Sequence, residues 1–314
     1  MTGFEGVAGH RRALGLLERQ LESGQLAHSY LFVGEPQVGK TTVARHFAQL
    51  LLPEAPLGRH PDYWEDDRRV TIKIDEVRLI PSREPEAHSQ SLQAFLALKP
   101  AIGRRRVAVV SNAGRLKDET QGILLKTLEE PNPGRVIILT TPSVSPFVVL
   151  PTIVSRCQRI AFHPVDQAEI EQLLVAAGAP ADTAVELAGL ARGRPGWALH
   201  ALGDEELLVR HRRWRQMLEQ VPGAPRDVPL KIAQALDEAH MAWRAGEGQE
   251  HQDPLLEAME AWQLQIRQRM LGDAHPRAWA RLLELSYDAL GYHEQNVSPR
   301  LNLECFLLEC RRAS

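Results

Sequence analysis

The sequence predicts an α/β domain with a parallel sheet, followed by a region of helices alone. Between residues 30 and 163, short apolar runs alternate with stretches of helical periodicity, a pattern typical of a parallel sheet covered by helices on both faces. After residue 163 the apolar runs give way to amphipathic segments, separated by breaks rich in proline, glycine and polar residues. Such breaks are typical of the connections between helices.

Five apolar runs are expected to be the strands of the sheet: SYLFVG at 29–34, RVTIKI at 69–74, RRVAVV at 105–110, RVIILTT at 135–141 and CQRIAF at 157–162. Two of these runs differ in pattern. Residues 107–110 are apolar throughout, as in a central strand. Val70, Ile72 and Ile74 instead alternate with polar residues, as in a strand with one wet face.

Beyond the predicted sheet, the helical region divides into two parts. Residues 166–178 and 181–191 are expected to form two short helices, followed by RGRPGWALHAL at 192–202. From about residue 205, five amphipathic segments follow. The chain is therefore expected to hold two or three domains, with changes in pattern near residues 164 and 205.

The bulk composition excludes several classes of protein. Of 314 residues, 44% are hydrophobic and 25% charged, as in globular proteins, and a net charge of −3 argues against a strongly basic nucleic-acid binder. Three cysteines (Cys157, Cys305 and Cys310) are too few and too scattered for a disulfide framework or a four-ligand zinc site. With neither an apolar run of about 18 residues nor a signal peptide, the chain is expected to be cytoplasmic, with no membrane partner.

One motif predicts a nucleotide site. GEPQVGKT at 34–41 fits the phosphate-binding pattern G-x-x-x-x-G-K-[ST], and it stands between a predicted strand and a predicted helix, as that pattern requires. Gly34 and Gly39 let the backbone curl around phosphate oxygens, Lys40 can reach the β- and γ-phosphates, and the Thr41 hydroxyl can ligate Mg²⁺. ATP or ADP with Mg²⁺ is the expected ligand, contacted by Gly34, Glu35, Pro36, Gln37, Val38, Gly39, Lys40, Thr41 and Thr42.

The acid that usually steadies the magnesium ion is not where the pattern requires it. The central run 107–110 ends in Ser111 and Asn112. Asp75 follows another predicted strand and is an alternative magnesium acid. Its position before EVRLIPS favours a helix N-cap instead.

Long stretches resemble the clamp-loader subunits of bacterial DNA polymerase III, members of the AAA+ family, and among them the delta-prime subunits. The resemblance covers most of residues 4–205. It rests on VAGHRRAL (7–14), AHSYLFVGEPQVGKTT (27–42), HPD (60–62), IKIDEVR (72–78), RVAVVSNAGRL (106–116), GILLKTLEEPNP (122–133), LPTIVSRCQRIAF (150–162) and GRPGWAL (193–199). LLKTLEEP and SRC together are the most characteristic, and NVSPRLNLECFLLE (296–309) is a weaker match.

The resemblance implies an architecture and further contacts. It implies an AAA+ nucleotide-binding core over 1–164, a small helical lid over 165–204 and a helical collar over 205–314 through which five subunits assemble. It adds Val7 and Ala8 to the expected nucleotide contacts, and it places a polar phosphate sensor at Thr140 and Thr141.

The departures from the family pattern are as informative as the matches. Active relatives have Asp-Glu where this chain has Ser111 and Asn112, so hydrolysis in its own pocket is expected to be very poor. Their phosphate-contacting lid arginine would fall near Gly196, with Arg194 as a weak substitute. The four-cysteine zinc module of many relatives is missing, so no zinc is expected.

Arg156 of SRC is the catalytic residue that the resemblance implies, acting in trans on a neighbouring subunit's ATP site. Arginine suits this role because its planar charge bridges phosphate oxygens. A surface ion pair is the alternative for this side chain. For Arg104, Arg105 and Arg106, which could meet DNA phosphate, a solvated turn is favoured.

The predicted function is therefore that of a delta-prime-like stator of a clamp loader. Its expected partners are the tau/gamma motor and delta subunits, the sliding clamp and primer–template DNA, in a hetero-oligomer. One alternative is an active motor ATPase that uses Asp75 as its magnesium acid. The other is a free-standing P-loop enzyme such as a small-molecule kinase, which leaves SRC and the helical tail unexplained.

Overall fold

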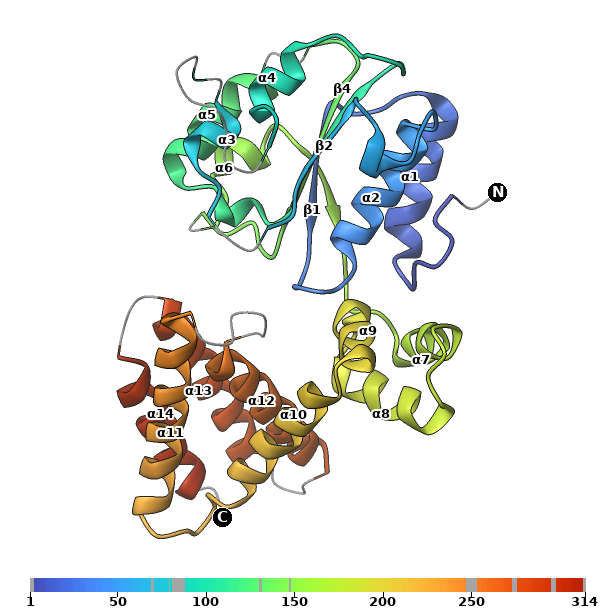
Figure 1. The fold of residues 1–314 in the computed structure, drawn as a ribbon. Helices are drawn as coiled ribbons and strands as arrows, with labels where there is room; N and C mark the ends of the chain where they lie inside the picture. The colour runs from blue at the N-terminus through green and yellow to red at the C-terminus, as the bar shows by residue number, and fades with distance from the viewer. Residues whose placement is uncertain are drawn as a thin grey trace. The chain divides into compact units, whose positions relative to one another are not determined.

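The computed structural model describes residues 3–68, 71–78, 80, 88–129, 132–146, 148–246, 253–272, 276–294 and 298–312 (Figure 1). The chain forms two compact units, Met1–Leu202 and Gly203–Ser314. Each unit is described by itself. The predicted boundary between residues 164 and 165 falls inside the first unit and stays a prediction.

The first unit is built on a five-stranded sheet in the order β2-β3-β4-β1-β5, with every neighbouring pair parallel. This confirms the predicted α/β class. The strands are β1 (Ser29–Val33), β2 (Tyr63–Asp66), β3 (Arg106–Val110), β4 (Arg135–Thr141) and β5 (Gln158–Ala161). Four of them lie within runs that the sequence predicted.

The predicted strand at 69–74 is wrong. Arg69 and Val70 lie outside the described residues, Ile72 forms only an isolated bridge with Leu116, and the helix α3 (Ile74–Val77) follows. The edge strand is instead YWED, in which Trp64 and Asp66 are buried. Sequence periodicity missed it because one of its inward-facing residues is a carboxylate, which is buried only because ion pairs compensate its charge.

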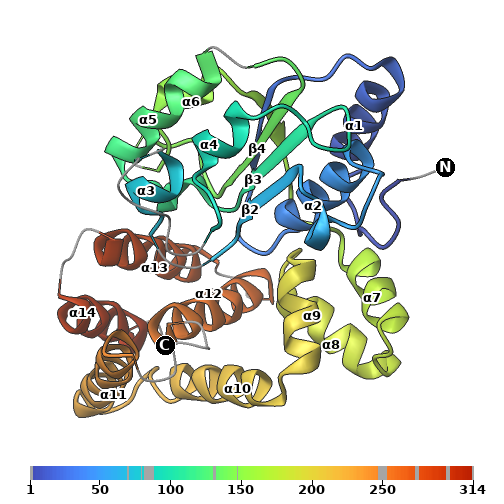
Figure 2. The same cartoon turned by 45° about the horizontal axis from the view of Figure 1, so that its top comes forward.

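Helices cover both faces of the sheet (Figures 1 and 2). The helices α1 (Arg11–Ser23) and α2 (Lys40–Leu51) pack on one face, against Tyr30 and Phe32 of β1. On the other face lie α3, α4 (Leu92–Ala97), α5 (Asp118–Glu129) and α6 (Pro151–Val154), packed around Leu31, Ala108 and Val110. Two short 3₁₀ turns, η1 (Leu57–Arg59) and η2 (Ala113–Arg115), complete the core. Successive residues of the central strands face opposite layers, so both layers need apolar side chains.

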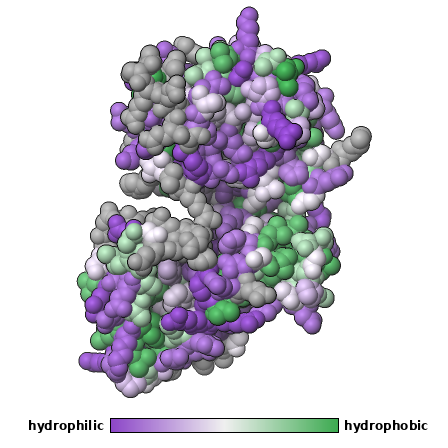
Figure 3. Space-filling model, viewed as in Figure 1, coloured by the Kyte–Doolittle hydropathy of each residue, from purple (hydrophilic) through white to green (hydrophobic). Residues whose placement is uncertain are grey.

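Three helices follow the sheet: α7 (Gln167–Ala176), α8 (Ala181–Ala191) and α9 (Pro195–Gly203). The turn after α8 lies close against the end of the core, because the Val165 amide donates to the Gly193 carbonyl at 2.9 Å. On the face seen in Figure 3, hydrophobic residues gather over these helices, which carry the exposed side chains of Val175, Val185 and Leu199.

Helices are the only regular secondary structure in the described residues of the second unit, and they confirm the five predicted segments. They are α10 (Glu205–Glu219), α11 (Asp227–Arg244), α12 (Pro254–Gly272), α13 (Arg277–Glu294) and α14 (Pro299–Arg312). Helix α11 packs against α14, and α12 packs against α10 and α13. The fully buried Trp262 anchors the core, where its indole N–H donates to the Trp214 carbonyl at 2.7 Å. No helix in the described part of the chain is both long and apolar enough to cross a membrane.

Candidate nucleotide-binding site

The phosphate-binding loop runs from the end of β1 to the start of α2. Gln37 and Gly39 have positive φ angles of 61° and 111°, so the backbone curls there, and α2 begins at Lys40. The loop also passes close to β5, since a Cβ on Gly34 would stand 2.3 Å from the Phe162 carbonyl oxygen. A glycine is needed at both ends of the loop, for the turn at Gly39 and for the close approach at Gly34.

His10 contacts the backbone of this loop. It was not among the residues singled out from the sequence. It precedes α1 with a positive φ of 58°, its Nε2 lies 2.8 Å from the Val38 carbonyl oxygen, and its ring lies 4.8 Å from that of Phe162. Burial lowers the pKa of His10. The sequence feature that could have identified His10 is its position directly before a helix, in the segment VAGHRRAL that resembles the clamp-loader family.

A cavity of about 360 Å³ opens beside the loop, at the carboxyl ends of β3 and β4. Residues from four separate segments line it: Pro36, Gln37, Gly39, Lys40, Thr41, Thr42, Ser111, Asn112, Thr140, Thr141, Pro142 and Gly196. The structure thus brings together six of the predicted nucleotide contacts with the polar ends of two strands. The carboxyl edge of a parallel sheet is where such folds bind ligands.

The remaining predicted contacts do not line this cavity. Val38 is fully buried in the core beneath the loop, and Val7 packs against the same core. Gly34, Glu35 and Ala8 are also absent from the lining.

Lys40 is the one charged residue in the lining. It is 7% exposed, and its ammonium donates to the carbonyl oxygens of Gly34 at 2.6 Å and Glu35 at 2.7 Å. Burial lowers the pKa of Lys40 to about 8, against the opposing effect of the Glu35 charge. Keeping this buried ammonium charged costs more free energy than keeping one charged in water. An anion bound beside it would lower that cost.

Thr41 faces a hydroxyl across the cavity. Its Oγ1 lies 3.1 Å from Oγ of Ser111, the residue that follows β3. Asn112 has a positive φ of 58°, its amide donates to Oγ1 of Thr140 at 2.8 Å, and its side chain accepts from the Gly114 amide. The end of β3 is therefore polar and uncharged where the nucleotide pattern places an acid.

Asp66 is the buried carboxylate closest along the sheet to this edge, because it pairs in register with Val110. It accepts hydrogen bonds from Arg115 at 2.8 Å, from Arg68 and from His88. Burial would raise the pKa of Asp66, but these hydrogen bonds outweigh burial and hold the pKa well below its usual range. Arg115 also donates to the Ser111 carbonyl at 2.8 Å, so it joins the ends of β2 and β3.

Asp75 lies elsewhere. It is 2% exposed in the first turn of α3 and is absent from the lining of the cavity. The N-cap of α3 is Lys73, so the prediction of Asp75 as the cap is wrong. The helix begins earlier than predicted because the preceding residues do not continue as a strand. Among the described residues, no three His, Cys, Asp or Glu side chains are grouped as metal ligands would be.

Helix α9 contacts the loop through a backbone amide. The Gly196 amide donates to the Gln37 carbonyl at 2.9 Å, and a Cβ on Gly196 would stand 2.8 Å from that oxygen. Arg194 is buried, donates to the Ala191 carbonyl at 3.1 Å and lies over the Trp197 ring at 5.9 Å. It is absent from the lining of the cavity, so the structure does not support it as the substitute for the lid arginine.

Arg156 lies away from this lining, between α6 and β5. Its guanidinium donates to the Thr152 carbonyl at 3.0 Å and pairs with Glu129 of α5. The two side chains are 34% and 48% exposed. The ion pair of the alternative interpretation is thus present, and it is open to solvent.

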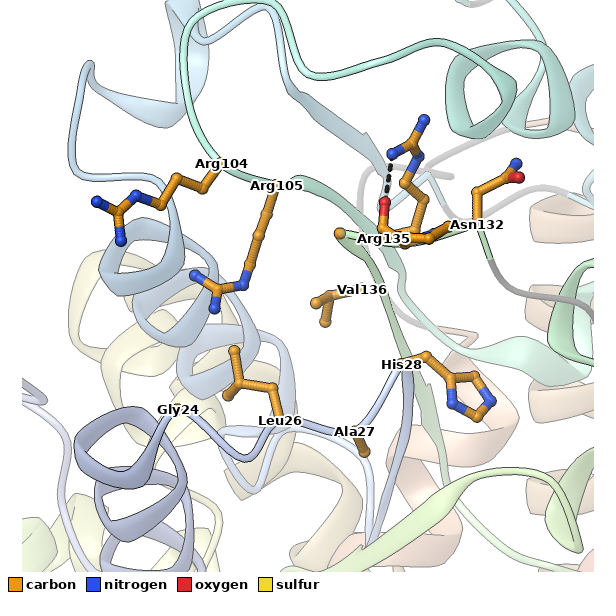
Figure 4. Close-up of a pocket in the computed structure, with 11 residues that line it drawn as sticks. Gly24, Leu26, Ala27, His28, Arg104, Arg105, Asn132, Arg135 and Val136 are labelled. Atoms are coloured by element: carbon orange, nitrogen blue, oxygen red, sulfur yellow. Dashed lines mark hydrogen bonds between the residues drawn. The ribbon is translucent and has the colours of Figure 1, made fainter.

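The three arginines at 104–106 divide between two environments. Arg106 is buried, pairs with Asp62 at 3.3 Å and lies over the Phe95 ring. Arg104 and Arg105 border a hollow of about 340 Å³ near the amino ends of β3 and β4, with their guanidinium groups directed away from Arg135 (Figure 4). Only Arg104 and Arg105 are therefore placed to meet a ligand from solution.

The fold and the loop define the class of protein, and comparison with known proteins then gives its family. The chain has an α/β AAA+ fold: a gamma subunit-related DNA polymerase III protein from Thermotoga maritima superposes with a TM-score of 0.53 at 19% identity, over 95% of this chain and 99% of that one. The family model described as DNA polymerase III, delta subunit, matches residues 9–166.

Individual relatives agree with that match. The chain is 32% identical to the DNA polymerase III subunit delta' of Pseudomonas aeruginosa over 205 residues, 58% of each protein. It is 27% identical to the delta' subunit of Bacillus subtilis over 179 residues, 52% of this chain and 50% of that one. The chain matches about half the length of these delta' relatives. It belongs to the DNA polymerase III delta-subunit family, and its resemblance to delta-prime subunits is confirmed.

Proposed function

We propose that this chain is the delta-prime-type stator of a clamp loader. It binds ATP or ADP in its own phosphate loop without appreciable hydrolysis, places Arg156 in the ATPase site of a neighbouring subunit, and helps to load a sliding clamp on primed DNA during replication. The observation that carries this proposal is the end of β3. There, beside an intact phosphate loop, Thr41 faces the hydroxyl of Ser111 and no carboxylate.

Nucleotide binding is supported by the groups that the loop presents. Lys40 lines the cavity at the start of α2, where free backbone N–H groups and the helix dipole favour phosphate. Thr41 lines it as well, and we propose that its hydroxyl faces any Mg²⁺ that arrives already bound to the nucleotide, as one neutral contact that does not itself hold the ion. Zinc has no part in this proposal.

Weak hydrolysis follows from the groups that the lining lacks. No Asp or Glu is among the lining residues, all of which are described. General-base chemistry contributes about 10²–10⁴-fold to such reactions. Without that contribution, turnover in this pocket would be slow even with nucleotide firmly bound.

Arg156 is exposed enough to serve another subunit. Its pair with Glu129 is open to solvent on both sides, and exposed pairs of this kind are worth about 0–1 kcal/mol. The cost of transferring the guanidinium to a phosphate is therefore small. An arginine that reaches a neighbour's γ-phosphate is worth about 10³–10⁵ in rate.

The proposed partners follow from the relatives. Relatives named DNA polymerase III subunit tau, tau/gamma and delta' each match about half of this chain. We propose assembly with the tau/gamma motor and delta subunits in the cytoplasm, through the five helices of the second unit, with the clamp and primer–template DNA as further partners.

Three variants in a reconstituted loader test the proposal. Arg156→Ala should lower the DNA- and clamp-stimulated ATPase of the whole loader, and should lower clamp loading further if the sites fire in a coupled order. Lys40→Ala should change the ATPase little, because this pocket contributes little turnover. Arg156→Lys should rescue poorly, since an ammonium cannot bridge two oxygens.

Arg159→Ala is the matched control, because Arg159 is an exposed arginine three residues away in β5. Unchanged ATPase with Arg156→Ala would reduce Arg156 to its surface ion pair. A large loss with Lys40→Ala would identify this chain as an active motor subunit instead.

A further inference from the structure

We infer that nucleotide binding to this chain does not depend on Mg²⁺. The inference rests on the proposed nucleotide binding and concerns the Thr41–Ser111 contact. In phosphate-loop ATPases the loop Ser or Thr and an acid from a neighbouring strand together hold the ion. Here a neutral hydroxyl stands at 3.1 Å from Thr41 in place of the acid.

The residues around the cavity do not fit a magnesium site. Mg²⁺ prefers a nearly octahedral set of oxygen ligands and is usually held through one or two carboxylates as well as the substrate phosphates. The side chains of the lining offer neutral oxygen ligands and no carboxylate: the hydroxyls of Thr41, Thr42, Ser111, Thr140 and Thr141 and the amides of Gln37 and Asn112. Thr41 supplies one neutral ligand, and its hydroxyl already has Ser111 as a partner.

The buried acid one strand away cannot supply the missing carboxylate. Asp66 stands at the same edge of the sheet, but its side chain is 0% exposed and is bound by Arg68, Arg115 and His88. Moving it toward Thr41 would break these contacts and take the carboxylate away from the buried guanidinium of Arg115, which is strongly destabilising. Arg115 also fixes the Ser111 carbonyl, so the end of β3 keeps its position.

This geometry determines how strongly the binding of Mg²⁺ and the binding of nucleotide are coupled, and that coupling can be measured. The factor by which Mg²⁺ raises nucleotide affinity equals the factor by which the protein raises the affinity of the nucleotide for Mg²⁺. If the protein adds no charged ligand for the ion, Mg²⁺ does not raise the affinity of the protein for the nucleotide, and the protein does not raise the affinity of the nucleotide for Mg²⁺. The phosphate charge is met instead by Lys40 and by the amides at the start of α2.

The test is the affinity of the full chain for ADP, measured by calorimetry in buffer with Mg²⁺ and in buffer with EDTA. We expect the two dissociation constants to agree within about threefold, below the 5- to 150-fold range typical of real coupling between two ligands. Ser111→Asp should create the missing acid, so that ADP binds at least about tenfold more weakly in EDTA than in Mg²⁺. Ser111→Asn has a similar size without the charge and should remain independent of the metal.

The outcomes separate this inference from the proposed function. Binding of ADP by the wild-type chain only in Mg²⁺ would overturn the inference and leave the proposed nucleotide binding intact. Binding in neither buffer would overturn both.

A second measurement does not depend on any variant folding. Mn²⁺ added to the wild-type chain with ADP should bind no more tightly than to ADP alone, as followed by its electron paramagnetic resonance signal. Tighter binding in the ternary mixture would show a protein-held metal and would contradict the inference.

Discussion

The nucleotide cavity and the edge that carries Arg156 differ in how firmly their polar groups are held. In the cavity, Lys40 is bound to two loop carbonyls, and the Gly196 amide holds the loop through Gln37. At the edge, the guanidinium of Arg156 is half-buried and is held by the Thr152 carbonyl of α6 and by the solvent-exposed carboxylate of Glu129. The groups proposed to bind phosphate are firmly held, and the group proposed to act on a neighbour is loosely held.

In the proposed function, these two regions contribute to two different nucleotide sites. The cavity holds the groups proposed to contact phosphate and has the neutral Ser111 in place of an acid. The edge carries Arg156, which is paired with the exposed Glu129 and is proposed to serve the site of a neighbouring subunit. Each change described below alters one of these two regions, and the properties of the other region should change little.

Removal of the second unit should have the largest effect, and only on the edge. A chain that ends after Gly203 cuts between α9 and α10, at the boundary of the two compact units. It should fold and bind ADP, but fail to co-purify with the motor and delta subunits, so that Arg156 no longer affects any ATPase. Circular dichroism, calorimetry with ADP and pull-down measure the three properties. Stable assembly of this truncation would contradict the role of the helical unit.

Gly34→Ala should damage the cavity and spare the edge. The added methyl would stand 2.3 Å from the Phe162 carbonyl oxygen, so the loop must move away from β5. Overpacking of this kind costs about 1–3 kcal/mol, and we expect a lower melting temperature together with about tenfold weaker ADP binding. Gly122→Ala is the control, because a Cβ there meets nothing within 4 Å in α5. An ADP affinity unchanged by Gly34→Ala would show that the loop is not the binding site.

The sequence predicted most of this arrangement because its signals are local. The loop at 34–41, four of the strands and the five helices of the second unit follow from periodicity and turn residues. The edge strand at 63–66 did not, because Asp66 is buried through partners at 68, 88 and 115 that lie far apart in sequence. The hydrogen bond from the Gly196 amide to the loop could not be predicted either, since a backbone amide is the same in every residue other than proline and has no side-chain pattern.

The affinity of the cavity for ADP should change by about tenfold with pH. Burial lowers the pKa of Lys40 to about 8 from the usual 10.5. Above that pH the ammonium loses its proton, and ADP binding should weaken by about tenfold between pH 7 and pH 9. Calorimetry over this range checks the loss, and a flat profile would contradict the role of Lys40 in phosphate binding.

Stability without nucleotide should move in the opposite direction. Between pH 8 and 10.5 the unfolded chain holds the Lys40 proton more firmly than the folded chain does. The free energy of unfolding attributable to Lys40 therefore rises with pH in that window. The free energy of unfolding of the wild-type chain minus that of Lys40→Met, measured by denaturant titration, should therefore increase as pH rises through this window.

Glu129→Gln should have the smallest effect, and it tests how loosely the edge holds its arginine. The substitution removes the charge that pairs with Arg156 while keeping the shape of the side chain. Because both partners are largely exposed, the free energy of unfolding should change by less than about 1 kcal/mol. In the reconstituted loader the ATPase should be unchanged or slightly higher, since Arg156 then leaves its partner at lower cost. A loss of ATPase as large as that of Arg156→Ala would mean that Glu129 orients the arginine for its neighbour, and the edge would then be as firmly built as the cavity.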